Sequence, residues 1–203
     1  MDMNIISTYI SMISDIVVGL SALGAVILAV YSVNQWKREH RGKAAYDLAR
    51  QIFLLAYEFK AQYDYARNPI TFGQESRDRM PQPGESQDDK SLNDEQYVRV
   101  ERLKALHATV MKLRNASWEA DILLSDDVAG ALRKLFDHFE KLMSAVNTHF
   151  WMRKQALHGR VAPAEMIGED CTTYIYGIPS DDVGRQLHID VENLVRSLKL
   201  YIK

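Results

Sequence analysis

The stretch Ile16–Val33 has the sequence IVVGLSALGAVILAVYSV and contains no charged residue. A helical run of about 18 apolar or small residues is long enough to cross the hydrocarbon core of a membrane, which is about 30 Å thick. The segment 36–43, WKREHRGK, follows closely, and Trp and cations are typical of the membrane–water interface. The sequence therefore predicts a transmembrane anchor over residues 1–36 and a second domain over residues 37–203.

Charges on the two sides of the apolar stretch differ in sign. Before it the chain carries acids only, Asp2 and Asp15. No Lys or Arg precedes it, whereas the leading region of a cleaved signal peptide carries such cations. Because cations collect on the cytoplasmic side, we expect the amino terminus outside the cell and the second domain in the cytoplasm. The cations after the stretch are also expected to bind anionic lipid headgroups; they are Lys37, Arg38, Arg41 and Lys43.

Small and hydroxylated residues recur along one face of the predicted anchor. Ser11, Ser21 and Ala25 lie on this face, which is defined by spacings of three and four residues. In lipid, small residues let helix backbones approach closely, and serine can hydrogen-bond across the contact. Asp15 lies beside the face, either at the outer headgroup level or near a polar axis shared by several copies. We therefore expect homo-oligomers held by these four residues, with an aqueous pore along their axis as an open alternative.

Composition limits what the second domain does. The formal net charge is −2, so nucleic acid is not an expected partner. A single cysteine, Cys171, excludes an internal disulfide and fits a reducing cytoplasm. The sequence lacks a phosphate-binding loop, a nucleophile elbow and a metal signature, and none of its histidines form a pair four residues apart. We therefore expect no cofactor and no metal.

Helical periodicity predicts one long helix from about residue 5 to residue 67. It ends before Pro69, because proline cannot continue a helix. A polar loop over 68–92 follows, and Ser91 or Asn93 is expected to start the second helix. The aromatic residues on the later part of the long helix are predicted to be core contacts; they are Tyr46, Phe53, Tyr57, Phe59, Tyr63 and Tyr65.

Two further helices are predicted from caps followed by regular apolar stripes. Ser125 precedes one stripe and Ser180 precedes the other, each with acids in the favourable first turn. Between them we expect an irregular stretch that ends at Pro179, in which Thr172–Tyr176 is a strand or an extended segment of little importance. The fold class is thus all-α, an anchor helix that continues into a cytosolic bundle of about four helices.

An arginine followed by a histidine, with four residues between them, occurs three times; the pairs are Arg102/His107, Arg133/His138 and Arg153/His158. This spacing resembles that of helical HEPN ribonucleases, in which histidine would transfer a proton and arginine would stabilise phosphoryl charge. Arg133 and His138 are the best placed, because they lie on the most regular core helix. Five residues rotate a helix by about 140°, however, so the two side chains diverge. An enzyme is therefore not expected, and a ribonuclease remains the alternative.

The segment from Trp36 to Gly73 resembles a widespread group of uncharacterised bacterial membrane proteins. In that group a transmembrane helix leads into W-x-x-E-H-x-G-K, then an aromatic-rich helix, then a stop of the form R-N/S-P-x-x-F-G. The matching residues here are Trp36, Glu39, His40, Gly42, Lys43, Arg67, Pro69, Phe72 and Gly73. The architecture is similar to that of the HEPN-like membrane accessory protein of type VI-B CRISPR loci. The resemblance implies a HEPN-like bundle without nuclease activity, in an oligomeric assembly of the bacterial inner membrane that acts in antiphage defence.

Three hypotheses follow. In the first, copies associate in the lipid bilayer and perturb or permeabilise it on a cytosolic signal. In the second, the protein is a membrane-tethered ribonuclease that uses Arg133 and His138. In the third, it is a non-catalytic adaptor that recruits a cytosolic protein partner through the loop 68–92.

Overall fold

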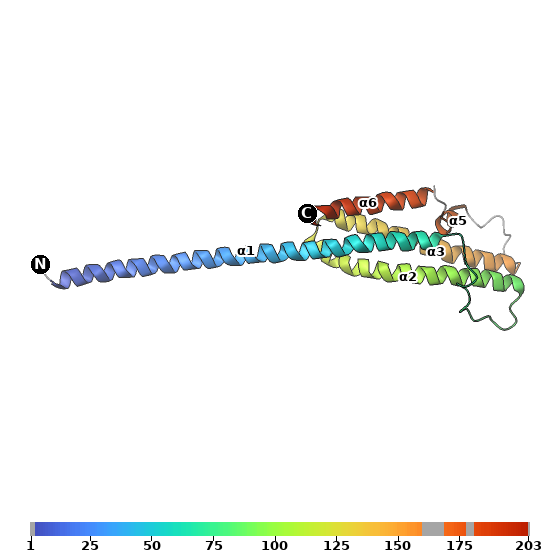
Figure 1. Cartoon of the computed structure of the whole chain (residues 1–203), viewed down its shortest axis with the longest axis horizontal. Helices are drawn as coiled ribbons and strands as arrows, with labels where there is room; N and C mark the ends of the chain where they lie inside the picture. Colours follow the sequence, from blue (N-terminus) through green and yellow to red (C-terminus); the bar gives the residue numbers. More distant parts are fainter. Residues whose placement is uncertain (1–2, 160–168, 178–180, 203) are drawn as a thin grey trace. The chain divides into compact units, whose positions relative to one another are not determined.

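The chain is described here by a computed structural model that covers residues 3–159, 169–177 and 181–202. In this described part the protein is helical and contains no strand, which confirms the predicted all-α class (Figure 1). The helices are α1 (Met3–Arg67), α2 (Gln87–Leu123), α3 (Asp126–Leu157), α5 (Glu169–Ile175) and α6 (Asp182–Ile202).

The long helix predicted for residues 5–67 is confirmed as α1, Met3–Arg67. Asn68 and Pro69 follow it directly, as the helix-stop argument requires. The chain divides into two compact units, Met1–Ala44 and Ala45–Lys203, and the division falls within α1. From Met3 onward the first unit consists of α1 alone, and the second contains the rest of α1 and the other four described helices.

In the first unit, the apolar side chains that the structure describes on α1 are exposed. An 18-residue window of this helix reaches a mean hydropathy of 2.0 and carries no buried residue. Leu20, Leu23 and Leu28 are 65%, 62% and 67% exposed. By length and composition this helix could span a membrane.

The second unit has one hydrophobic core. The inner face of α1 contributes Ile52, Phe59 and Tyr63, which are fully buried. α3 packs against α2, α5 and α6. The long helices α2, α3 and α6 run side by side through the unit, and the short α5 lies near one end of it (Figure 1). The stripes predicted for α3 and α6 are confirmed as core; their buried members are Val128, Leu132, Leu135, Phe139, Leu142, Val146, Phe150, Leu187, Val191, Leu194, Val195 and Leu198.

The prediction that all aromatics on the later part of α1 are core contacts is wrong for three of them. Tyr46, Tyr57 and Tyr65 are 41%, 49% and 48% exposed. Tyr46 and Tyr57 lie on the face of the helix that is turned away from the core. The Tyr65 ring lies at the edge of the core, where the Arg102 guanidinium of α2 is 4.7 Å from its centroid.

The second helix starts earlier than predicted. α2 begins at Gln87, and the Ser86 side chain caps it by accepting a hydrogen bond from the backbone N–H of Asp89 at 3.1 Å. The acids Asp88 and Asp89 are in the first turn, where they favour a helix, although they had been assigned to the polar loop. The loop therefore spans 68–86 instead of 68–92.

The segment expected to be extended is helical. α5 (Glu169–Ile175) contains most of Thr172–Tyr176, and Ile175 is fully buried in the core. Ser180, the predicted cap of the last helix, lies outside the described residues. Its neighbour Asp181 serves as a cap, because its carboxylate accepts a hydrogen bond from the Gly184 N–H at the start of α6.

Candidate functional site

The residues predicted for self-association lie on α1 in the first unit. The Ser21 hydroxyl donates a hydrogen bond to the carbonyl oxygen of Val17, at 2.8 Å, so its polarity is satisfied within its own helix. A hydroxyl satisfied in this way is tolerated in lipid and still leaves a small surface for a neighbouring helix. Ala25 is exposed beside it. The side chains of Ser11 and Asp15 lie outside those described.

The predicted headgroup-binding segment carries an aromatic pair as well as cations. The rings of Trp36 and His40 lie 4.3 Å apart, and His40 Nδ1 is 3.2 Å from the Trp36 carbonyl oxygen. Trp36 remains 57% exposed. An exposed indole next to flexible cations matches the chemistry of a membrane interface. The cations Lys37, Arg38, Arg41 and Lys43 are all exposed on the same stretch of helix.

A buried ion pair lies at the end of α1, and the sequence did not predict it. Arg67 is 2% exposed, and its guanidinium pairs with the Asp181 carboxylate at 2.9 Å. It also donates to the carbonyl oxygens of Tyr174 and Thr173, at 2.8 and 2.7 Å. Arg67 thus ties the last turn of α1 to α5 and to the cap of α6. The only sequence signal for it is its place at the predicted helix stop before Asn68 and Pro69.

Two arginines of α2 bind the same end of α1. Arg99 donates to the carbonyl oxygens of Ala66 and Asn68, at 3.0 and 2.7 Å. Arg102 also donates to the carbonyl oxygen of Asn68, at 2.8 Å. Its guanidinium donates two further hydrogen bonds of 2.8 Å to the Glu75 carboxylate. Cations are favourable here, because the last carbonyl groups of a helix lack partners within the helix and carry partial negative charge.

The arginine contacts fix the loop 68–86. The hydrogen bonds from Arg102 lower the pKa of Glu75, which keeps this carboxylate charged and paired. At the far end of the loop, Arg79 pairs with Glu85 at 2.9 Å and holds the pKa of that carboxyl to about 2. Between these contacts the loop exposes three large apolar side chains: Ile70, Phe72 and Met80 are 59%, 62% and 89% exposed.

A second polar cluster connects α2, α3 and the residue after α5. Glu95 accepts hydrogen bonds from the Tyr176 hydroxyl at 2.6 Å and from Arg153 at 2.7 Å. Burial raises the pKa of Glu95, but these two bonds outweigh it and the net shift is downward. Burial and the charge of Glu95 raise the pKa of Tyr176 to about 12. His149 Nε2 lies 3.4 Å from the same hydroxyl, and burial, aided by Arg153, lowers the pKa of His149. The cluster is a charge-balanced contact between helices.

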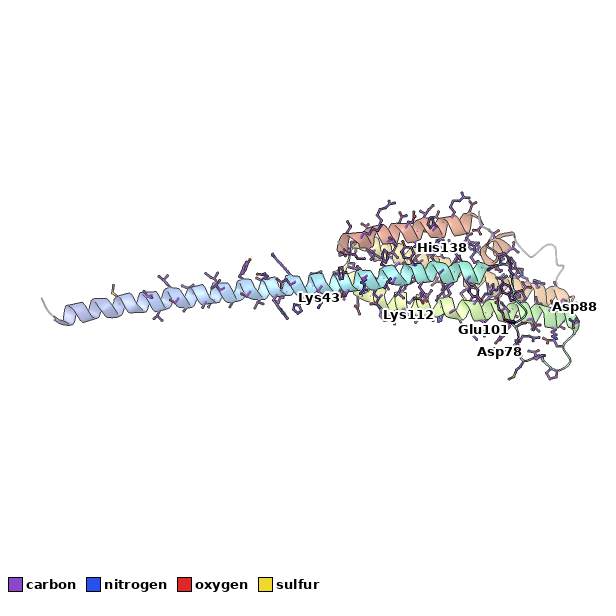
Figure 2. The ribbon with its side chains drawn as sticks, viewed as in Figure 1. Lys43, Asp78, Asp88, Glu101, Lys112 and His138 are labelled. Atoms are coloured by element: carbon purple, nitrogen blue, oxygen red, sulfur yellow. The ribbon has the colours of Figure 1, made fainter. Side chains whose placement is uncertain are left out.

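Arg133 and His138, the candidate ribonuclease pair, are not brought together. Arg133 is exposed, and its Nε donates to the Ala129 carbonyl oxygen of its own helix at 3.3 Å. His138 is buried and contacts Asp190 of α6, with 3.0 Å between His138 Nε2 and Asp190 Oδ2 (Figure 2). The divergence expected from the helix repeat is therefore present. In the other two pairs the arginines also have partners, Glu75 for Arg102 and Glu95 for Arg153.

The described residues do not assemble a metal site, because no three His, Cys, Asp or Glu side chains among them converge. A groove of about 760 Å³ lies beside Arg67 and Asp181, between the end of α1 and the start of α6. Its basic residues each have an acidic partner, so it offers no surplus positive charge to an anion. These pairs are Lys60–Asp64, Arg67–Asp181, Arg185–Asp182 and His188–Glu192.

A comparison of the chain with protein-family models, with curated proteins and with solved structures found no match.

Proposed function

We propose that this chain is an oligomeric membrane effector. In this proposal α1 is inserted in the bacterial inner membrane, and copies associate through the small-residue face of the helix. A signal that reaches the cytosolic bundle then makes the assembly perturb or permeabilise the membrane. The partners are the lipid bilayer and further copies of the chain.

The exposure of the apolar part of α1 carries this proposal. Its 18-residue apolar window has no buried residue. Burial of apolar surface is worth about 25 cal/mol per Å², so a continuous apolar surface of this length is costly in water and stable in lipid. A core helix of a soluble protein has the same composition but is covered by its neighbours, as the inner face of α1 is at Ile52 and Phe59.

The proposed orientation rests on the charges that flank the apolar stretch. The four cations between Lys37 and Lys43, together with Trp36, support a cytoplasmic interface at this level. Each cation near an anionic surface contributes about 1 kcal/mol of attraction. The bundle after residue 44 then lies in the cytoplasm. Its role in antiphage defence and its HEPN-like character rest on the resemblance carried by segment 36–73.

Leucine on the small-residue face tests the proposal. Ser21→Leu combined with Ala25→Leu adds bulk where copies approach, so we expect oligomers to be lost while insertion is kept. The matched control is Gly19→Leu combined with Val30→Leu, which adds bulk on the opposite side of the helix, where a Cβ at Gly19 meets nothing within 4 Å.

The measurements are the mass of the protein in lipid nanodiscs, membrane permeability, and protection of the host from phage. Loss of oligomers and of protection in the first variant, with both kept in the control, supports the proposal. Wild-type protein that is monomeric in nanodiscs, or variant oligomers equal to those of the wild type, would overturn it.

The adaptor function is a second candidate, because the loop 68–86 is clamped at both ends and yet exposes apolar side chains. Changing Ile70, Phe72 and Met80 together to serine leaves the arginine contacts in place. Loss of phage protection in this variant, with oligomers and permeability unchanged, favours the adaptor. Unchanged protection eliminates it. For the ribonuclease alternative, no contact of Arg133 or His138 adds support.

A further inference from the structure

In the bundle, the outer face of α1 carries apolar side chains that have no cover. Tyr46, Leu54 and Tyr57 are 41%, 59% and 49% exposed, and Ala61 is exposed with them. These residues follow one another at spacings that keep them on one side of the helix, opposite the buried Ile52. Exposure of such an apolar row to water is unfavourable, and a row of this kind is typical of a surface that binds a partner.

We infer that this outer face of α1, residues 46–61, is a contact between copies of the chain, and that it continues the association of the membrane segments through the cytosolic unit. The inference rests on the proposed function in one respect. Chains inserted with one topology have parallel α1 helices, so that equivalent residues of neighbouring copies come to lie near one another around a symmetry axis.

Charge on the outer face also fits a second copy. Asp47 and Arg50 are exposed one turn apart on it, and neither makes an ion pair or hydrogen bond within the described part of the chain. Opposite charges one turn apart suit parallel neighbours, because Arg50 of one copy reaches toward Asp47 of the next. Lys60 and Asp64, by contrast, already pair with each other at 2.7 Å.

A bilayer is a poor occupant for the same face. Leu54 and Tyr57 follow Lys43, the last cation of the collar, by about three turns or more of the helix, which takes them past the headgroup layer. At that distance from the membrane, protein and not lipid would cover these apolar side chains.

Cysteine cross-linking of the full chain in lipid vesicles tests the inference. In a Cys171→Ser background, which removes the one native cysteine, Ala61→Cys is a small change on the outer face. We expect several-fold more disulfide-linked dimer from it than from Leu200→Cys, whose native side chain is 75% exposed on α6. Equal cross-linking at the two positions would overturn the inference.

Charge reversal gives a second measurement. Asp47→Arg alone and Arg50→Asp alone each place like charges across the contact, and we expect each to lower dimer yield in the Ala61→Cys protein by about fivefold, the limit for an exposed ion pair. The double reversal should restore the yield. A double variant no better than either single change would count against the contact.

The outcomes separate this inference from the proposed function. Oligomers that depend on Ser21 and Ala25 but give no cross-link at Ala61 overturn the outer-face contact and leave the effector proposal standing. A cross-link at Ala61 that persists after Ser21→Leu and Ala25→Leu supports the contact and removes the small-residue face as its cause. Monomeric wild-type protein overturns both.

Discussion

The two parts of α1 place similar apolar residues in opposite surroundings. Leu28, in the first unit, is 67% exposed, whereas Ile52, in the second, is fully buried. The second part is covered on one face by stripes from the other helices of the bundle and carries charges on its outer face; the apolar stretch of the first part carries no charge on any face. The charge pattern around a helix, and not its hydropathy alone, therefore distinguishes a core helix from one suited to lipid.

The largest expected effect comes from the cation that ends the second part. Arg67→Met removes the cation that neutralises the buried Asp181 carboxylate, which has 6% side-chain exposure, and should lower the free energy of unfolding by about 3–5 kcal/mol. Lys43→Met, an exposed cation of the same helix, should change it by less than about 0.5 kcal/mol. Denaturant unfolding of the full chain in micelles, followed by near-UV circular dichroism, measures both.

A second variant tests the Arg67 prediction even if the first variant fails to fold. Combining Arg67→Met with Asp181→Asn removes both charges and keeps a side-chain oxygen for the Gly184 N–H, and it should recover part of the stability, because the penalty comes mainly from the buried negative charge. A double variant as unstable as the single one would show that Arg67 acts through the carbonyl oxygens of Thr173 and Tyr174 instead.

A charge placed in the first part should affect insertion and not folding. Leu23→Arg puts a cation near the middle of the apolar stretch, and we expect it to disfavour membrane insertion by about 2.5–3.5 kcal/mol. Leu54→Arg makes the same chemical change on the exposed face of the second part and should leave insertion unchanged. Carbonate extraction of membranes separates inserted from peripheral protein. Equal extraction of the two variants would contradict the difference between the two parts.

Periodicity and caps were sufficient to predict the four long helices, because they are local properties of the sequence. α1 ends at Arg67 as the Asn68–Pro69 stop requires, and α3 buries the predicted stripe. The start of α2 was misplaced because Asp88 and Asp89 suit a polar loop as well as a first helical turn. α5 was missed because its single buried anchor, Ile175, gives no periodic signal.

The buried polar contacts were not predictable to the same degree. Arg67 binds groups more than 100 positions away in the chain, at Tyr174 and Asp181, and burial of an arginine depends on such distant partners. His138 shows the converse case. Its spacing from Arg133 suggested chemistry, but its ring contacts Asp190 of another helix, a partner that spacing within one helix cannot reveal.

The smallest expected effect is the response of the second unit to mild acid. Burial, aided by Arg153, lowers the pKa of His149 below 6.5 in the folded protein. The unfolded chain therefore binds more protons as the pH falls below about 6.5, and stability decreases until the pH passes the lower pKa of the folded state. Glu95 has its pKa lowered from 4.5 by Tyr176 and Arg153 despite its burial, so a further loss should follow below about pH 4.5.

Unfolding midpoints of the full chain between pH 7.5 and 4 measure this response, and His149→Gln serves as the control. The variant should lose the first decline, between pH 6.5 and 5, and keep the second, because Glu95 retains Tyr176 and Arg153. Insertion of the first unit should not change over this range, since its apolar stretch contains neither acids nor histidine. A variant with the wild-type slope above pH 5 would assign the first decline to a histidine other than His149, and acid-dependent insertion would remove the contrast between the two units.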